Sequence, residues 1–250
     1  MNDRVVVVTG SSDGIGAAIA KVFGSRGYSV YITFLSNEAG ARQVAQSVES
    51  HRSEANIRQL DVRSEDSVSR LFDDVRQTYG HLDVLVNNAV REVSKPLDQA
   101  SYDEWRTVLS TKLDGAFLCT RAAMPLFMAA PAPSMIALST PEGQQPNPDY
   151  PAYGVANAGI DAFVKAMALF LPKYGARCNA VCPGPVPTSL WGPDETNDEM
   201  WTELAKNNPV GRNTTREDVA EVVYLVATEP TRMMNGNFVY VNGGNHLRPA

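Results

Sequence analysis

The chain has 250 residues, of which 44% are hydrophobic and 20% are charged, and this composition is ordinary for a folded globular protein. The length suits one α/β domain with its own hydrophobic core, and the composition excludes disordered and fibrous classes. The 22 Lys and Arg residues are outnumbered by 28 Asp and Glu residues, which leaves a net charge of −6. Because nucleic-acid backbones are bound by basic patches, we expect no nucleic-acid partner.

The cysteines, histidines and apolar segments argue against a disulfide-bonded, metal-binding, secreted or membrane protein. The three cysteines, Cys119, Cys178 and Cys182, cannot all pair, so we expect free thiols in a reducing compartment. The three histidines lack partners at metal-ligand spacing, which predicts no metal site. The valine run at 5–8 is too short for a signal peptide, and we find no continuous apolar run of about 18 residues. We therefore expect a cytoplasmic protein without a membrane partner.

Strand and helix signals alternate along the chain. Strands are predicted over residues 5–9, 29–34, 56–60, 84–87, 134–139, 177–182 and 238–241. Amphipathic helices are predicted over residues 14–26, 38–50, 65–79, 103–129, 152–173 and 216–228. This alternation requires a parallel sheet with helices on both faces. Residues 141–151 and 183–212 are rich in Pro and Asn, and we expect them to be irregular and to border a ligand.

The segment from Gly10 to Gly16 lies between the first strand and the first helix. Its glycines permit a tight turn, and the helix that follows offers free N–H groups to a pyrophosphate. The spacing is G-x3-G-x-G, whereas the commoner dinucleotide fingerprint is G-x-G-x-x-G. Taken alone, the turn fits a phosphate site and a structural loop equally well.

An ordered series of motifs narrows the fold and the activity. It comprises Thr9-Gly-x3-Gly-Ile-Gly16, Asp61-Val62, Asn87-Asn88-Ala89, Tyr153, Asn179-x3-Pro183-Gly-Pro-Val-Pro-Thr188 and Asn242-Gly-Gly244. From residue 4 to 244 the chain resembles the short-chain dehydrogenase/reductase family, most closely its 3-oxoacyl reductase-like branch. The resemblance implies a single Rossmann-fold domain over residues 1–250, a doubly wound sheet of about seven strands in the order 3-2-1-4-5-6-7, and a lid at about 188–212.

The resemblance also implies a nicotinamide cofactor, NAD(P)(H). The residues expected to bind it are Gly10, Ser12, Gly14, Ile15, Gly16, Ser36, Asp61, Val62, Asn87, Ala89, Pro183, Gly184, Val186 and Thr188. The choice between NAD and NADP is open, because the second predicted strand ends in Phe-Leu-Ser-Asn, without an acid or a base. Asp13 would repel a 2′-phosphate, whereas Ser36 could bond one.

The catalytic positions depart from the family pattern, which is an Asn, a Ser, a Tyr and a Lys four residues after the Tyr. The matching positions here are Lys112, Thr140, Tyr153 and Asn157, so the two outer members have changed places. In the family the Tyr exchanges a proton with the substrate oxygen, the Ser holds that oxygen, and the Lys lowers the Tyr pKa. Lowering a Tyr pKa from about 10 to about 7 requires roughly 4 kcal/mol, which an ammonium at about 4 Å supplies and a neutral amide does not.

Two interpretations of Lys112 are open. Either it reaches Tyr153 from the neighbouring helix and lowers its pKa, or it turns to solvent or pairs with Asp114 or Asp161. Three functions are open as well: a carbonyl reductase or alcohol dehydrogenase with a rearranged tetrad, a non-redox acid–base enzyme that dehydrates, isomerises or cyclises a secondary metabolite intermediate, and a catalytically silent subunit. In the last two, the cofactor transfers no hydride.

The expected partners are a small-molecule substrate and further copies of the chain. Residues near the expected pocket, namely Arg91, Glu142, Tyr150 and Trp191, indicate a ligand with apolar and polar parts. Trp191 and Trp201 are expected to pack on apolar groups. The resemblance implies a homotetramer or homodimer that forms through the helices at 103–129 and 152–173.

Overall fold

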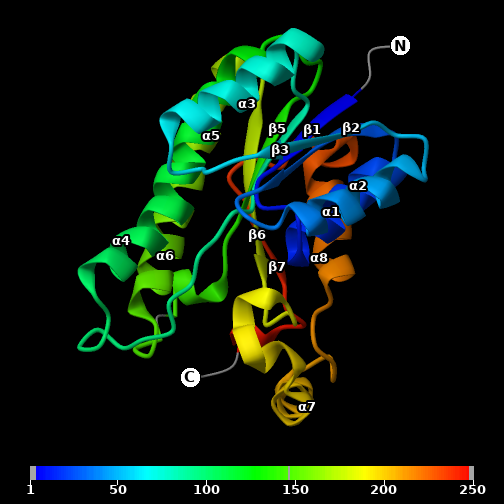
Figure 1. The fold of residues 1–250 in the computed structure, drawn as a ribbon. Helices are drawn as coiled ribbons and strands as arrows, with labels where there is room; N and C mark the ends of the chain where they lie inside the picture. Colours follow the sequence, from blue (N-terminus) through cyan, green and yellow to red (C-terminus); the bar gives the residue numbers. More distant parts are fainter. Residues whose placement is uncertain (1–3, 146, 248–250) are drawn as a thin grey trace.

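Seven parallel strands form one sheet through the centre of the protein (Figure 1). The computed structural model describes residues 4–145 and 147–247. Its strands are β1 (Arg4–Val8), β2 (Tyr28–Phe34), β3 (Ala55–Gln59), β4 (Val84–Asn87), β5 (Ser134–Leu138), β6 (Arg177–Pro183) and β7 (Phe238–Val241). Their order is β3-β2-β1-β4-β5-β6-β7, which confirms the predicted sheet. Each strand begins and ends within one residue of its prediction.

Helices cover both faces of the sheet. One layer holds α1 (Gly14–Ser25), α2 (Glu38–Glu49) and α8 (Arg216–Ala227), and the other holds α3 (Glu65–Thr78), α4 (Tyr102–Leu109), α5 (Gly115–Phe127) and α6 (Pro151–Phe170) (Figure 1). The valines of β1 show how the sheet separates two cores, because Val5 and Val7 pack towards α3 and α5 whereas Val6 and Val8 pack towards α1 and α8. All four are fully buried, as expected for a central parallel strand.

The helix predicted over residues 103–129 is not continuous. It consists of α4, a π-helical turn at Ser110–Asp114, and α5. Such turns are rare and often occur at functional sites. Lys112 lies at the centre of this turn, where the helix passes the carboxyl ends of the strands.

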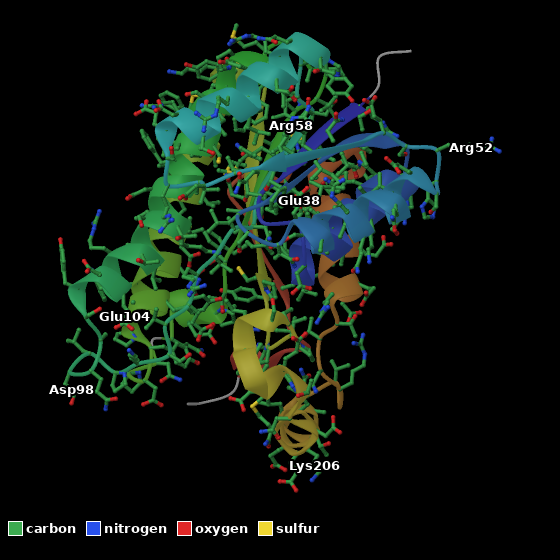
Figure 2. The ribbon with its side chains drawn as sticks, in the orientation of Figure 1. Glu38, Arg52, Arg58, Asp98, Glu104 and Lys206 are labelled. Carbon is green, nitrogen blue, oxygen red and sulfur yellow. The ribbon has the colours of Figure 1, made fainter. Side chains whose placement is uncertain are left out.

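The prediction that residues 183–212 are irregular was wrong for α7 (Asp198–Asn207). Asn197 caps this helix by accepting the N–H of Met200 at 3.1 Å, and the first turn carries two acidic residues that favour the positive end of the helix dipole. Trp201 buries the inner face of α7 and packs edge-to-face on Trp191 at 5.1 Å between ring centroids, as expected. Lys206 points away from the sheet (Figure 2). The segment predicted to form a lid therefore contains a packed helix.

The segment Pro151–Tyr174 is long and apolar enough for a membrane span, with 24 residues and a mean hydropathy of 1.4. The sequence analysis found no continuous apolar run of that length, because the few polar residues of the segment are scattered through it. In the fold, α6 packs against β6 and α4. Ile160 and Val164 are buried in the core on the sheet side, and Ala152 and Ala156 pack against Val108 of α4. We therefore describe it as a core helix of the domain.

Candidate active site

The glycine turn lies where β1 ends and α1 begins. Gly10 and Gly14 have φ angles of 64° and 60°, a left-handed conformation that side chains disfavour. A Cβ atom on Gly16 would lie 2.3 Å from the carbonyl oxygen of Gly10, so any side chain there would disrupt the turn. The turn thus keeps an open groove beside the N-terminus of α1, where backbone N–H groups favour an anion.

Asn88 attaches this turn to β4. Its side-chain amide donates to the carbonyl oxygens of Thr9 and Gly10, both at 2.9 Å, and its N–H donates to the Thr9 hydroxyl. Asn87, the predicted cofactor residue, lies outside the groove and donates to the Thr120 hydroxyl at 3.1 Å. Because successive side chains of a strand point to opposite faces, only one of the two asparagines can reach the turn. The sequence pointed to the Asn-Asn-Ala motif but assigned the cofactor role to Asn87, whereas Asn88 is the residue that lines the groove.

A groove of about 510 Å³ runs past the glycine turn. It brings together most of the predicted cofactor residues: Gly10, Ser12, Gly14, Ile15, Gly16, Asp61, Val62, Ala89 and Thr188. Ser36 is exposed and does not line the groove, whereas its neighbour Leu35 does. At the position where we expected the Ser36 hydroxyl to face a 2′-phosphate, the groove is instead lined by the apolar side chain of Leu35.

Asp61 at the far end of the groove is paired with Arg63. The Arg63 guanidinium donates to both carboxylate oxygens, with Nε to Oδ1 at 2.9 Å and Nη2 to Oδ2 at 2.7 Å. These hydrogen bonds lower the pKa of Asp61, so the carboxylate stays charged. Arg63 also lines the groove, and a ligand amino group would share Asp61 with it.

Arg216 connects the glycine turn to the lid. Its Nε donates to the Pro187 carbonyl oxygen at 2.8 Å, its Nη2 forms an ion pair with Glu195 of the lid, and its Nη1 lies 3.9 Å from Asp13. Asp13 in turn accepts the N–H of Gly14 at 2.6 Å, so its carboxylate occupies part of the α1 N-terminus. Sequence reasoning missed Arg216 because these partners are far from it along the chain.

A second cavity, also about 510 Å³, continues from the groove. The two share the lining residues Ile15, Asn88, Val90, Glu92, Thr188 and Leu190. It brings together the predicted catalytic residues Lys112, Thr140 and Tyr153 with the predicted cofactor residues Pro183, Gly184 and Val186. Asn157 lines neither cavity. The dinucleotide groove and the predicted catalytic side chains therefore belong to one connected space.

Lys112 lies at the inner wall of the second cavity and is only 5% exposed. Within the described part of the chain its amino group forms neither an ion pair nor a hydrogen bond, and Asp114 pairs with Arg106 instead. Burial lowers the pKa of Lys112 to about 8, and the charges of Cys182 and Asp161 oppose that change. Lys112 is therefore directed into the protein, and the interpretation that it turns to solvent is excluded.

Tyr153 lines the same cavity from α6, and its surroundings disfavour ionisation of the phenol. Burial, followed by the charges of Glu142 and Glu92, raises its pKa, while the Asn157 side chain opposes the rise. The sequence had led us to consider a lowering by Lys112, and the pKa is raised instead. Asn157 is fully buried and its Nδ2 donates to the Tyr153 carbonyl oxygen at 2.9 Å, while its Oδ1 accepts no hydrogen bond.

Thr140 follows β5 and donates its hydroxyl hydrogen to Glu142. Ser139, which also follows β5, donates its hydroxyl hydrogen to Asp161 at 2.6 Å. Ser139 and Thr140 both line the second cavity, so the choice of Thr140 as the catalytic hydroxyl stays a prediction. Glu92, which follows β4, lines the same wall and was missed by sequence reasoning.

Comparisons with known proteins identify the family and agree with the fold. The family model described as Enoyl-(Acyl carrier protein) reductase matches residues 10–246. The 3beta-hydroxysteroid dehydrogenase 1 of Eggerthella lenta is 33% identical over 100% of this chain and 96% of its own, and the 3-oxoacyl-[acyl-carrier-protein] reductase of Staphylococcus aureus is 30% identical over 98% of both. A variant of actinorhodin polyketide ketoreductase solved with NADPH has a TM-score of 0.91 at 27% identity, covering 98% of this chain and 97% of that one.

Proposed function

Because the chain belongs to the short-chain dehydrogenase/reductase family, we propose that it is an NAD(P)(H)-dependent oxidoreductase that interconverts a secondary alcohol and its carbonyl compound. The observation that carries this proposal is the connected cavity, which joins the glycine turn to Tyr153, Thr140 and Lys112. The similar proteins above are named as dehydrogenases and reductases, in keeping with this chemistry.

The residues of the groove fit a nicotinamide dinucleotide. The positive φ angles of Gly10 and Gly14 and the closed space at Gly16 form a cradle that a phosphate can approach and a side chain cannot. Thr188 lines both cavities, and we place it with Val186 at the nicotinamide end. When bound, such a cofactor supplies or accepts a hydride.

We assign two roles in carbonyl reduction: Tyr153 donates the proton, and Lys112 binds the substrate oxygen. The raised pKa keeps the phenol protonated, so Tyr153 can donate its proton to a carbonyl oxygen that becomes a hydroxyl. Lys112 presents an unpaired ammonium to the same cavity and can hydrogen-bond that oxygen as negative charge develops. Asn157 holds the backbone one helical turn before it, and so positions Tyr153.

A non-redox acid–base enzyme is the second candidate, and one observation favours it. The cavity holds Tyr153, whose phenol remains protonated, together with Lys112, whose pKa of about 8 lets it lose a proton. An acid and a base with separated pKa values suffice for a dehydration or an isomerisation. In that case the same cavity would act without oxidising or reducing a nicotinamide.

Cofactor binding and turnover decide between the two. We would titrate the protein with NADH and NADPH, following reduced-nicotinamide fluorescence and thermal stability, and then measure oxidation of secondary alcohols with NAD⁺ and NADP⁺ at 340 nm. We expect binding of at least one cofactor, and turnover that Tyr153→Phe reduces by about a hundredfold, because general acid catalysis contributes about that factor or more. Binding of neither cofactor at millimolar concentration would overturn the proposal. Binding without turnover of any alcohol would favour the acid–base alternative.

We further propose that the protein is a homotetramer or homodimer that uses α5 and α6. Apolar side chains are exposed on these helices, including Phe117, Val155 and Leu169. Val155→Glu should reduce the mass measured by light scattering to that of the monomer. Leu225→Glu on α8 is the matched control, because Leu225 is 50% exposed and Val155 is 49% exposed. A monomeric wild-type protein would contradict this proposal.

A further inference from the structure

The substrate cavity has an acidic wall. Four carboxylates line it, from the loop after β4, the turn after β5, the turn before α6 and the segment after β6: Glu92, Glu142, Asp149 and Asp194. Lys112 is the only Lys, Arg or His among the lining residues. None of the four carboxylates forms an ion pair with a cation in residues 4–145 and 147–247. The cavity is therefore poor in positive charge where a ligand would enter.

Glu92 and Glu142 are the inner members of this wall. Both are partly buried, and each accepts a hydrogen bond from a neighbouring hydroxyl, Glu92 from Ser94 at 2.8 Å and Glu142 from Thr140. Burial raises the pKa of both carboxyl groups, and the charge of Glu92 raises that of Glu142 further. A carboxylate without a cation is costly in such a place, and a bound cation removes that cost.

Lys112 provides an independent indication that a ligand completes the cavity. Its side chain is more than nine-tenths buried, yet it lines the cavity and has no hydrogen-bond acceptor in the described chain. A buried ammonium requires an acceptor, and a ligand oxygen within the cavity can supply one. A ligand that pairs with Lys112 and with the acidic wall thus carries an oxygen for Lys112 and a cationic group for Glu92 and Glu142.

Aromatic rings around the cavity suit the same cation. Tyr150 and Tyr153 stand edge-to-face with their centroids 6.3 Å apart, and Trp191 lines the cavity from the lid. Ammonium groups bind favourably over the faces of such rings, so the aromatic and acidic side chains recognise one chemical group together.

We propose that the substrate is an amino alcohol or its amino ketone, whose oxygen meets Lys112 and Tyr153 and whose ammonium meets Glu92 and Glu142. This substrate class rests on the proposed function. In the oxidative direction the carbinol C–H leaves as a hydride to NAD⁺ or NADP⁺ and the hydroxyl proton leaves to solvent, so the alcohol is oxidised and the cofactor is reduced.

A matched pair of probes tests the ammonium site. 2-Amino-1-phenylethanol and 1-phenylpropan-1-ol have nearly the same shape, and only the first carries an ammonium. Calorimetry near pH 7.5 should show about tenfold tighter binding of the amine, which corresponds to about 1.4 kcal/mol. Glu92→Gln and Glu142→Gln should each reduce this preference severalfold, whereas Glu49→Gln on the exposed side of α2 should leave it unchanged.

Equal binding of the two probes would overturn the inference, as would undetectable binding of the amine or a preference that both glutamate variants retain. Turnover separates this result from the proposed function. Equal oxidation of both alcohols with NAD⁺ or NADP⁺ would support the oxidoreductase and refute the ammonium site. Preferential binding of the amine without any nicotinamide reduction would support the site and refute the oxidoreductase.

Discussion

Replacing Lys112 with Met should stabilise the protein. The pKa of Lys112 is about 8 in the fold and 10.5 in an exposed chain, so the folded protein holds this proton less tightly than the unfolded one. At 1.36 kcal/mol per pKa unit, the difference corresponds to about 3 kcal/mol of lost stability below pH 8. Met keeps the length and the apolar stem of the side chain and removes the buried charge. A residue that costs this much stability is expected to serve function.

The pH dependence gives the sign of this effect. Below about pH 8, Lys112 is charged in the folded and the unfolded state, and the full loss of stability is present. Between about pH 8 and 10.5 only the unfolded state keeps the proton, so the free energy of unfolding rises with pH. Urea unfolding should show that wild type gains about 2 kcal/mol more than Lys112→Met between pH 7 and about pH 9.5. A variant that is less stable at pH 7, or that has the same pH profile as wild type, would refute the reasoning.

Three further outcomes are expected. Asn157→Lys should lower the pKa of Tyr153 by about two units, because an ammonium at about 5 Å contributes roughly 3 kcal/mol. Absorbance titration, with Tyr153→Phe as the reference, measures this pKa, and Asn157→Met controls for side-chain length. The double variant Lys112→Asn with Asn157→Lys should reduce carbonyl substrates faster than either single variant in a 340 nm assay, and a double variant no faster than the singles would count against the exchange of roles. Gly16→Ala should weaken NADH binding more than tenfold, because its Cβ would lie 2.3 Å from a carbonyl oxygen, and unchanged fluorescence titration would contradict the assigned cradle.

The positions of the elements could be predicted because local patterns specify them. The valines of β1 must be buried on both sides, so they indicate a central parallel strand without any tertiary information. The helix α7 escaped prediction because it lies in a stretch rich in Pro and Asn, although its buried Trp201 packs on Trp191.

The sequence by itself determined the sheet, its strand order, the glycine turn and the identities at the four catalytic positions. Only the tertiary structure decided where charges lie. It directed Lys112 into the second cavity, brought Glu92 and Glu142 to the same cavity, and connected Arg216 to Asp13 and Glu195. The physical reason is that backbone patterns repeat over a few residues, whereas electrostatic neighbours come from loops at the carboxyl ends of separate strands. These loops meet only after the whole sheet has formed.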